Sequence, residues 1–171
     1  CSALVLEALR RRWGRAPMLL AAVALTLYPL LGLGPILSTA RSQATITQQV
    51  LHPLVQFVRA HGSSEVTLAM SDCGIVPYLS RAQVIDLWGL NDREIARDGF
   101  WVERVVARQP DLFVLVSRSG DRFDPLFAWE GALAEDDGFK RDYRLARVFS
   151  APAPIAYHSW VFERAARGTV P

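Results

Sequence analysis

The segment from Ala16 to Ala40 contains no charged residue, although 21% of the whole chain is charged. A helix needs about 20 residues to cross a bilayer core about 30 Å thick, because each residue advances about 1.5 Å. The segment therefore predicts a transmembrane helix over residues 16–40. Pro29 and Gly32 would weaken an isolated helix, but they are tolerated in a membrane where neighbouring helices pack nearby. This indicates, as partners, upstream transmembrane helices of the same parent chain.

Basic residues flank this segment unequally. Four arginines stand at positions 10 to 15, whereas Arg41 alone follows the segment directly. Because cytoplasmic flanks carry an excess of basic residues, residues 1–15 are predicted to be a cytoplasmic basic segment. Residues 42–171 would then form an extracytoplasmic domain at the cell membrane, with membrane lipid as a partner. A cleaved signal peptide is the alternative, but the apolar run is long for one and no small-x-small cleavage site follows it.

The remainder of the chain, about 130 residues, has the length of one ordinary domain. Its short apolar runs predict strands at residues 66–70, 83–87 and 112–116, with helical segments between them. Two further strands are expected near the end, at residues 143–149 and 156–163. The predicted fold class is α/β: a small three-layer domain with a mainly parallel sheet and an antiparallel C-terminal strand pair.

The local sequence predicts three helices in this domain. An amphipathic helix is expected over Thr45–Arg59, with Pro53 at a kink or in the first turn of a second helix. Asn91, followed three residues later by Glu94, predicts the capped start of another helix. A further helix is expected over residues 100–108.

Polar side chains follow the predicted strands at the edge where ligands of open α/β sheets tend to bind. Carboxylate and amide groups there can bind sugar hydroxyls, and aromatic rings can stack on the sugar. We therefore predict a glycan site with no catalytic residue of its own. The alternative is structural: Asp72 and Asn91 would cap helices, and the tryptophans Trp88 and Trp101 would be core residues. The predicted substrate-binding residues are Asp72, Tyr78, Asp86, Trp88, Asn91 and Asp92.

The stretch SDCGIVPYLSRAQVIDLWGLND, residues 71–92, joins an acidic residue and glycine to Pro-Tyr, Val-Ile-Asp-Leu and a Gly-Leu-Asn-Asp turn. It resembles the C-terminal extracytoplasmic domain of bacterial polytopic glycosyltransferases of the C superfamily, such as cell-wall arabinofuranosyltransferases and mannosyltransferase-like membrane proteins. The resemblance covers roughly residues 45–116. It implies transfer from a polyprenyl-phosphate-linked sugar donor in cell-envelope glycan synthesis, with this domain helping to bind or position the acceptor glycan.

In that family the catalytic carboxylates lie in loops between earlier transmembrane helices, so the resemblance implies that the catalytic carboxylate lies outside this chain. Two alternatives from other classes stay open. The first is a single-span membrane protein with a non-catalytic outer interaction or structural domain. The second is a hydrolase acting on glycosides or esters.

Other classes of site find little support in the sequence. The predicted topology separates Cys1 from Cys73, so no disulfide between them is expected. The three histidines, His52, His61 and His158, lack the spacing of metal ligands, and we predict no metal or other cofactor. Basic residues alternate with acidic ones throughout the domain, which argues against a nucleic-acid partner.

Overall fold

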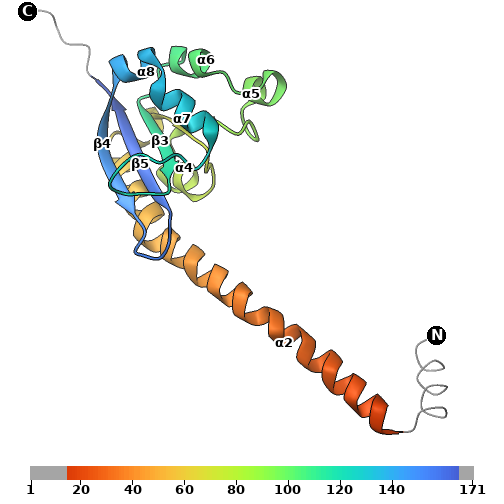
Figure 1. Cartoon of the computed structure of the whole chain (residues 1–171). Helices are drawn as coiled ribbons and strands as arrows, with labels where there is room; N and C mark the ends of the chain where they lie inside the picture. Colours follow the sequence, from red (N-terminus) through yellow and green to blue (C-terminus); the bar gives the residue numbers. More distant parts are fainter. Residues whose placement is uncertain (1–14, 166–171) are drawn as a thin grey trace, which may run out of the picture. The chain divides into compact units, whose positions relative to one another are not determined.

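The computed structural model describes residues 15–165, apart from the side chains of residues 15–18, 21, 26, 29–31 and 63. Most of the predicted cytoplasmic basic segment, residues 1–15, therefore lies outside the described residues. The chain divides into two compact units, Cys1–Gln43 and Ala44–Pro171. Each unit is considered by itself, with the element labels of Figure 1.

The first unit contains most of one long helix, α2, which spans Arg15–Ile46. Among the described residues no helix combines the length and the apolarity needed to cross a membrane. The predicted transmembrane helix over residues 16–40 is therefore wrong. The helix extends past that range into Arg41, and its second half mixes apolar residues with glycine, proline and hydroxyl side chains. Ser38 and Thr39 both donate hydrogen bonds to the carbonyl of Pro35, at 2.8 and 2.9 Å.

The described side chains of α2 include large apolar groups that are exposed to solvent. They belong to residues scattered around the helix rather than to one stripe. They are Leu19, Leu20, Val23, Leu25, Leu27, Tyr28, Leu33, Ile36 and Leu37.

The second unit begins with a helical segment that changes its winding at the expected proline. A five-residue π-helix, Thr47–Leu51, leads into α3, His52–Ala60. Pro53 lies in the first turn of α3, which confirms one of the two predicted placements. Proline is tolerated there because the first turn leaves backbone N–H groups without intrahelical partners. The wider winding before it is rare and usually takes the form of a single π-helical turn inside an α-helix.

Five strands form one mixed sheet in the order β2-β1-β3-β5-β4. Strand β1 pairs in parallel with both β2 and β3, whereas β5 runs antiparallel to both β3 and β4. The sheet is thus mixed and not mainly parallel as predicted, because β5 folds back beside β3 and makes half of the strand pairs antiparallel. The predicted antiparallel C-terminal strand pair is confirmed by β4 and β5. The strands span Thr67–Met70 (β1), Gln83–Asp86 (β2), Leu112–Ser117 (β3), Tyr143–Ser150 (β4) and His158–Arg164 (β5).

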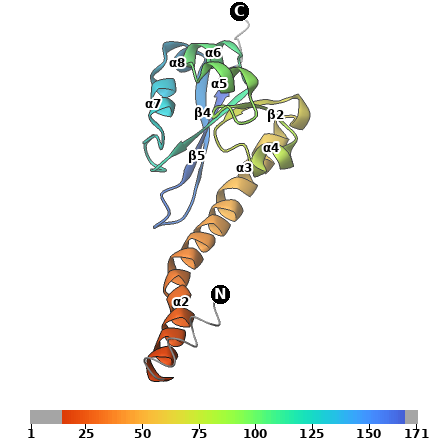
Figure 2. The ribbon, with the colours of Figure 1, turned by 90° about the vertical axis from the view of Figure 1, so that its right-hand side faces the viewer.

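Helices cover both faces of this sheet, so the unit is a small α/β domain with three layers (Figure 2). Helix α3 and α4, Ile75–Ser80, lie on one face. The other face carries α5, Arg93–Asp98, α6, Val102–Ala107, α7, Ala128–Glu135, and α8, Asp137–Asp142.

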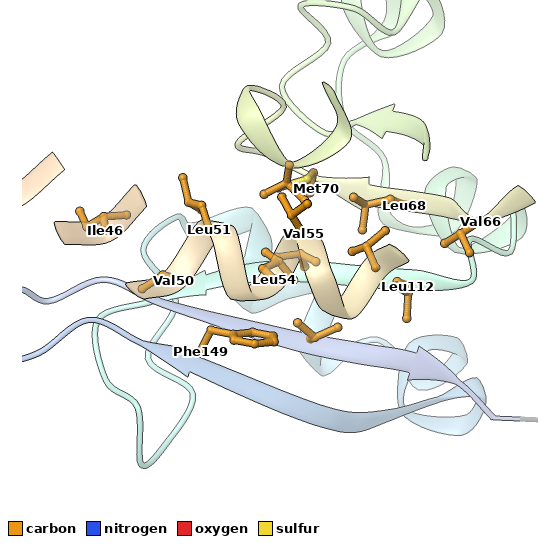
Figure 3. Close-up of a cluster of buried hydrophobic side chains, with 14 of the residues drawn as sticks. Ile46, Val50, Leu51, Leu54, Val55, Val66, Leu68, Met70, Leu112 and Phe149 are labelled. Carbon is orange, nitrogen blue, oxygen red and sulfur yellow. The ribbon is translucent and has the colours of Figure 1, made fainter. Parts of the chain in front are cut away.

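Strand β3 supplies both layers of the core because successive side chains point to opposite faces of a sheet. Leu112 and Val114 enter the first core cluster, between the sheet and α3 (Figure 3). Phe113 and Leu115 enter the second core cluster, beneath α5 to α8. All six residues of β3 are buried. This explains why its sequence is an almost unbroken apolar run.

Candidate functional site at the carboxyl ends of the parallel strands

The carboxyl ends of β1, β2 and β3 lie at one edge of the sheet, because the three strands are parallel neighbours. The segment after β1 carries Ser71, Asp72 and Cys73, and β2 ends on Asp86. The topology therefore brings the predicted polar residues to the same edge. Their contacts differ from one residue to the next, and so do the roles that they can have.

Asp86 is fully buried and is used to build the turn that follows β2. One carboxylate oxygen accepts a hydrogen bond from the backbone N–H of Trp88 at 3.0 Å. The other accepts from the backbone and side-chain N–H groups of Asn91, at 2.8 and 3.2 Å. With these partners and no exposed surface, Asp86 shapes the Trp88–Asn91 turn and does not itself face a ligand.

Asp92 caps helix α5, and the predicted cap by Asn91 is wrong because the amide of Asn91 turns back to Asp86. One oxygen of Asp92 accepts from the backbone N–H groups of Glu94 and Ile95, each at 3.1 Å. Its other oxygen lies 2.6 Å from the guanidinium of Arg108. Burial alone would raise the pKa of this carboxyl, but the Arg108 and backbone hydrogen bonds hold the pKa below its usual value.

Asp72, after β1, is exposed and accepts a hydrogen bond from the hydroxyl of Tyr157 at 2.9 Å. It caps no helix, since the residue that precedes α4 is Gly74 and no side chain caps it. Burial, followed by the negative charge of Asp72, raises the pKa of Tyr157. The pKa of the neighbouring Cys73 thiol is raised by burial and then by Asp86 and Asp72, so this thiol is a poor nucleophile.

Tyr78 and Trp88 are both exposed, but they belong to different layers. Tyr78 is 81% exposed on α4, whose neighbouring residues pack on the first core cluster. Trp88 is 51% exposed, and its ring makes T-shaped contacts with Phe127 and Trp129 at centroid distances of 5.0 and 6.2 Å. Trp129 belongs with the second core cluster. The structure therefore does not bring Tyr78 and Trp88 together.

Trp88 is the most exposed member of a group of rings that we call the aromatic row: Trp88, Phe127, Trp129 and Phe100. Phe127 and Trp129 stack with centroids 5.9 Å apart, and Phe100 lies 4.9 Å from Trp129. Trp101 is also exposed, at 55%, but its indole N–H donates to the carbonyl of Asp98 and no ring of the row contacts it. The aromatic row fixes the orientation of Trp88 while leaving half of its surface accessible.

Glu130 is the residue at this edge that the sequence analysis missed. It is fully buried, and one oxygen accepts from the backbone N–H of Val116 at 2.9 Å and from the hydroxyl of Ser71 at 3.4 Å. The other oxygen accepts from the backbone N–H of Phe127 at 3.3 Å. Burial raises the pKa of Glu130 to about 7, and the hydrogen bonds oppose this only in part. A glutamate in the first turn of a helix was the available signal, since such residues often bond back to the helix start.

The buried carboxylates at this edge serve as hydrogen-bond acceptors for the protein itself. The carboxylates of Asp86, Asp92 and Glu130 are buried and occupied by hydrogen-bond donors. Within the part of the chain that the structure describes, no group of three or more His, Cys, Asp or Glu side chains could hold a metal ion. Asp72 and Asn91 are the exposed polar side chains of the predicted set, and Trp88 is the exposed ring nearest to Asn91 in sequence.

Comparisons with known proteins place the sequence in a family but link it to no activity. No curated protein and no solved structure matches the chain. The resemblance to glycosyltransferases therefore stays a prediction. One family model, described as a domain of unknown function, DUF8728, matches residues 40–168, which is well over half of the chain. The chain thus belongs to the DUF8728 family of domains of unknown function.

Proposed function

We propose that this domain binds glycan without catalysing a reaction, as the acceptor-binding part of a glycosyltransferase of the cell envelope that uses a polyprenyl-phosphate-linked sugar donor. The observation that carries the proposal is the half-exposed ring of Trp88, which the aromatic row holds in place on the same turn as the exposed Asn91. The sequence resemblance of residues 71–92 to the outer domains of such enzymes supports the same function.

Trp88 suits the apolar face of a sugar ring. A large flat ring offers extensive contact area, and one that neighbouring rings already orient loses little conformational freedom on binding. The turn that carries Trp88 is itself fixed, because Asp86 accepts hydrogen bonds at both of its ends. The ring is therefore preorganised before any ligand arrives.

The polar side chains divide into two roles under this proposal. Asp86 and Asp92 hold the Trp88–Asn91 turn and the start of α5, and they stay buried. Asn91 remains exposed, and its side-chain oxygen can accept a hydrogen bond from a sugar hydroxyl. The ligand is thus recognised by stacking on Trp88 and by hydrogen bonds at the rim.

The test is isothermal titration calorimetry of the chain with arabinotetraose and with mannotetraose. Trp88→Ala should weaken binding by about tenfold, the equivalent of one aromatic contact of about 1.4 kcal/mol. Trp101→Ala is the matched control, because it removes a similarly exposed indole that lies outside the aromatic row. Equal losses in the two variants, or no binding of either sugar to the unmodified chain, would overturn the proposal.

A further inference from the structure

A groove of about 890 Å³ opens at the other end of the parallel strands, away from the edge that carries Trp88. It lies where the segment after α3, the connection from α6 to β3, the end of α8 and the end of β5 meet. Sites for small ligands enclose about 300–1,000 Å³. The groove therefore has the size of a ligand site. The lining residues that the argument uses are Glu65, Gln109, Asp111, Arg141, Glu163 and Arg164.

The walls of the groove are held by ion pairs and hydrogen bonds. Arg164 lies 2.8 Å from one oxygen of Asp111, and the other oxygen accepts from the backbone N–H of Thr67 at 2.8 Å. On the neighbouring wall, His61 lies 3.6 Å from Glu163. These contacts join the starts of β1 and β3 to the end of β5, so the polar groups are positioned before any ligand enters.

Gln109 lines the groove at a backbone position that favours glycine. Its φ is +51°, and its N–H donates to the carbonyl of Val106 just beyond the end of α6. Glycine is the usual residue at such a helix end because it adopts this conformation without steric cost. A glutamine is strained there, and what it adds over glycine is an amide in the groove, where its oxygen lies 3.4 Å from Arg164. Strained residues of this kind cluster at ligand sites.

The chemistry of the lining selects the ligand class. Two guanidinium groups and four carboxylates line the groove, together with the amide of Gln109. The carboxylates are those of Glu65, Asp111, Glu163 and also Asp142. The excess of carboxylates disfavours an anion. None of the exposed large apolar side chains among the described residues lines it. Hydroxyl groups match such a surface, because each can donate to a carboxylate or an amide oxygen and accept from a guanidinium.

We propose that this groove is a second binding site of the domain and that its ligand is a neutral saccharide segment. The inference rests on the proposed glycan-binding function and extends it, since the groove lies at the amino ends of the parallel strands and Trp88 follows the carboxyl end of β2.

The decisive variant is Gln109→Gly, which removes the amide but keeps the backbone conformation. Its stability should stay close to that of the unmodified chain, because relief of strain is opposed by the greater freedom of glycine in the unfolded chain. Arg81→Gly is the matched control: Arg81 has a φ of +63° after α4 and does not line the groove. Binding of arabinotetraose and mannotetraose is measured by calorimetry for both variants and for Trp88→Ala.

We expect Gln109→Gly to weaken binding by about fivefold, the loss of one hydrogen bond, and Arg81→Gly to leave the affinity unchanged. A loss in Trp88→Ala together with normal binding in Gln109→Gly would overturn the groove and leave the proposed function standing. A loss in Gln109→Gly with normal binding in Trp88→Ala would place the saccharide in the groove and refute the role of Trp88. Absence of binding to the unmodified chain would overturn both.

Discussion

Replacing Glu130 with glutamine should remove a large part of the pH dependence of stability between pH 4.5 and about pH 7. Glu130 is fully buried, and its carboxylate accepts hydrogen bonds from Val116, Phe127 and Ser71. The group joins the ends of β1 and β3 to the start of α7. Because it is buried in this way, its ionisation in the folded protein is costly.

The size of the effect follows from the difference between two pKa values. The ordinary pKa of the group is 4.5, and burial raises the pKa in the folded protein to about 7. A tenfold change in proton affinity corresponds to about 1.4 kcal/mol, so the difference amounts to about 3 kcal/mol. Between these pKa values the folded protein holds a proton that the unfolded chain has released. The free energy of unfolding should therefore fall as pH rises from 4.5 and level off above about 7.

The assay is urea unfolding of the purified chain at several pH values across this window, followed by circular dichroism. Glu130→Gln cannot ionise, so its stability should lack this decrease and should approach or exceed that of the unmodified chain at about pH 8. Glu135→Gln makes the same chemical change at a carboxylate with 80% side-chain exposure on the same helix, and it should keep the decrease.

Comparison of the unmodified chain with the two variants also separates Glu130 from the histidines. The same three histidines are present in all three proteins, so any contribution from them cancels in the comparison. A decrease in stability that is as steep in Glu130→Gln as in the unmodified chain would refute the reasoning. It would mean that water or a structural rearrangement lowers the cost of ionisation at this position.

Three further outcomes follow from the same contacts. Asp92→Ala should lower the free energy of unfolding by about 2 kcal/mol at neutral pH in urea titrations, since it removes a helix cap and leaves Arg108 without its partner. Because the pKa of Asp92 is lower in the folded protein, its contribution to stability is present above the ordinary pKa of 3.8. That contribution is lost as the pH falls through the lower pKa of the folded protein. Gly89→Ala should destabilise the domain by about 2 kcal/mol or more in thermal unfolding, because φ is +74° and a Cβ would lie 2.8 Å from the nitrogen of Ala96. Cys73 should react with iodoacetamide more slowly in the folded than in the urea-unfolded chain at mildly alkaline pH, because its thiol pKa is raised; equal rates would contradict this.

Local patterns predicted the strands well, because apolar runs in the sequence correspond to buried strands in the domain. The run Leu112–Val116 predicted a strand covered on both faces, and β3 spans Leu112–Ser117 with every residue buried. The expected strand at residues 143–149 corresponds to β4, Tyr143–Ser150. Pro53 lies in the first turn of a helix, one of the two positions that its missing N–H allowed.

The misses have different causes, and two of them are tertiary. A nearly unbroken apolar run predicted a transmembrane helix over residues 16–40, whereas no helix among the described residues, α2 included, combines the length and the apolarity that a span needs. Asn91 and Asp92 are neighbours with similar capping ability, and the choice between them depends on Asp86, which binds the amide of Asn91. The position of β5 beside β3 cannot be deduced from either strand alone.

The candidate site was predictable in its location and only partly in its composition. Parallel strands bring Asp72 and Asp86 to one edge, as expected, but sequence position does not tell which carboxylate is buried. Glu130 lies far from that stretch in sequence and reaches Ser71 only through the fold. Trp88 gains its support from Phe127 and Trp129, which also come from a distant segment.

The place of β5 in the sheet bears on how the chain is made. Strand β3 is central, yet one of its two partners is the last strand of the domain, and Ser117 pairs with His158. During synthesis β3 emerges well before β5, so the backbone N–H and C=O groups on one edge of β3 stay unpaired for that time. Strand β4 also has no partner strand until β5 follows. Such uncovered edges invite pairing with other chains. Once His158–Arg164 has left the ribosome, β5 can pair with β4 and with the free edge of β3.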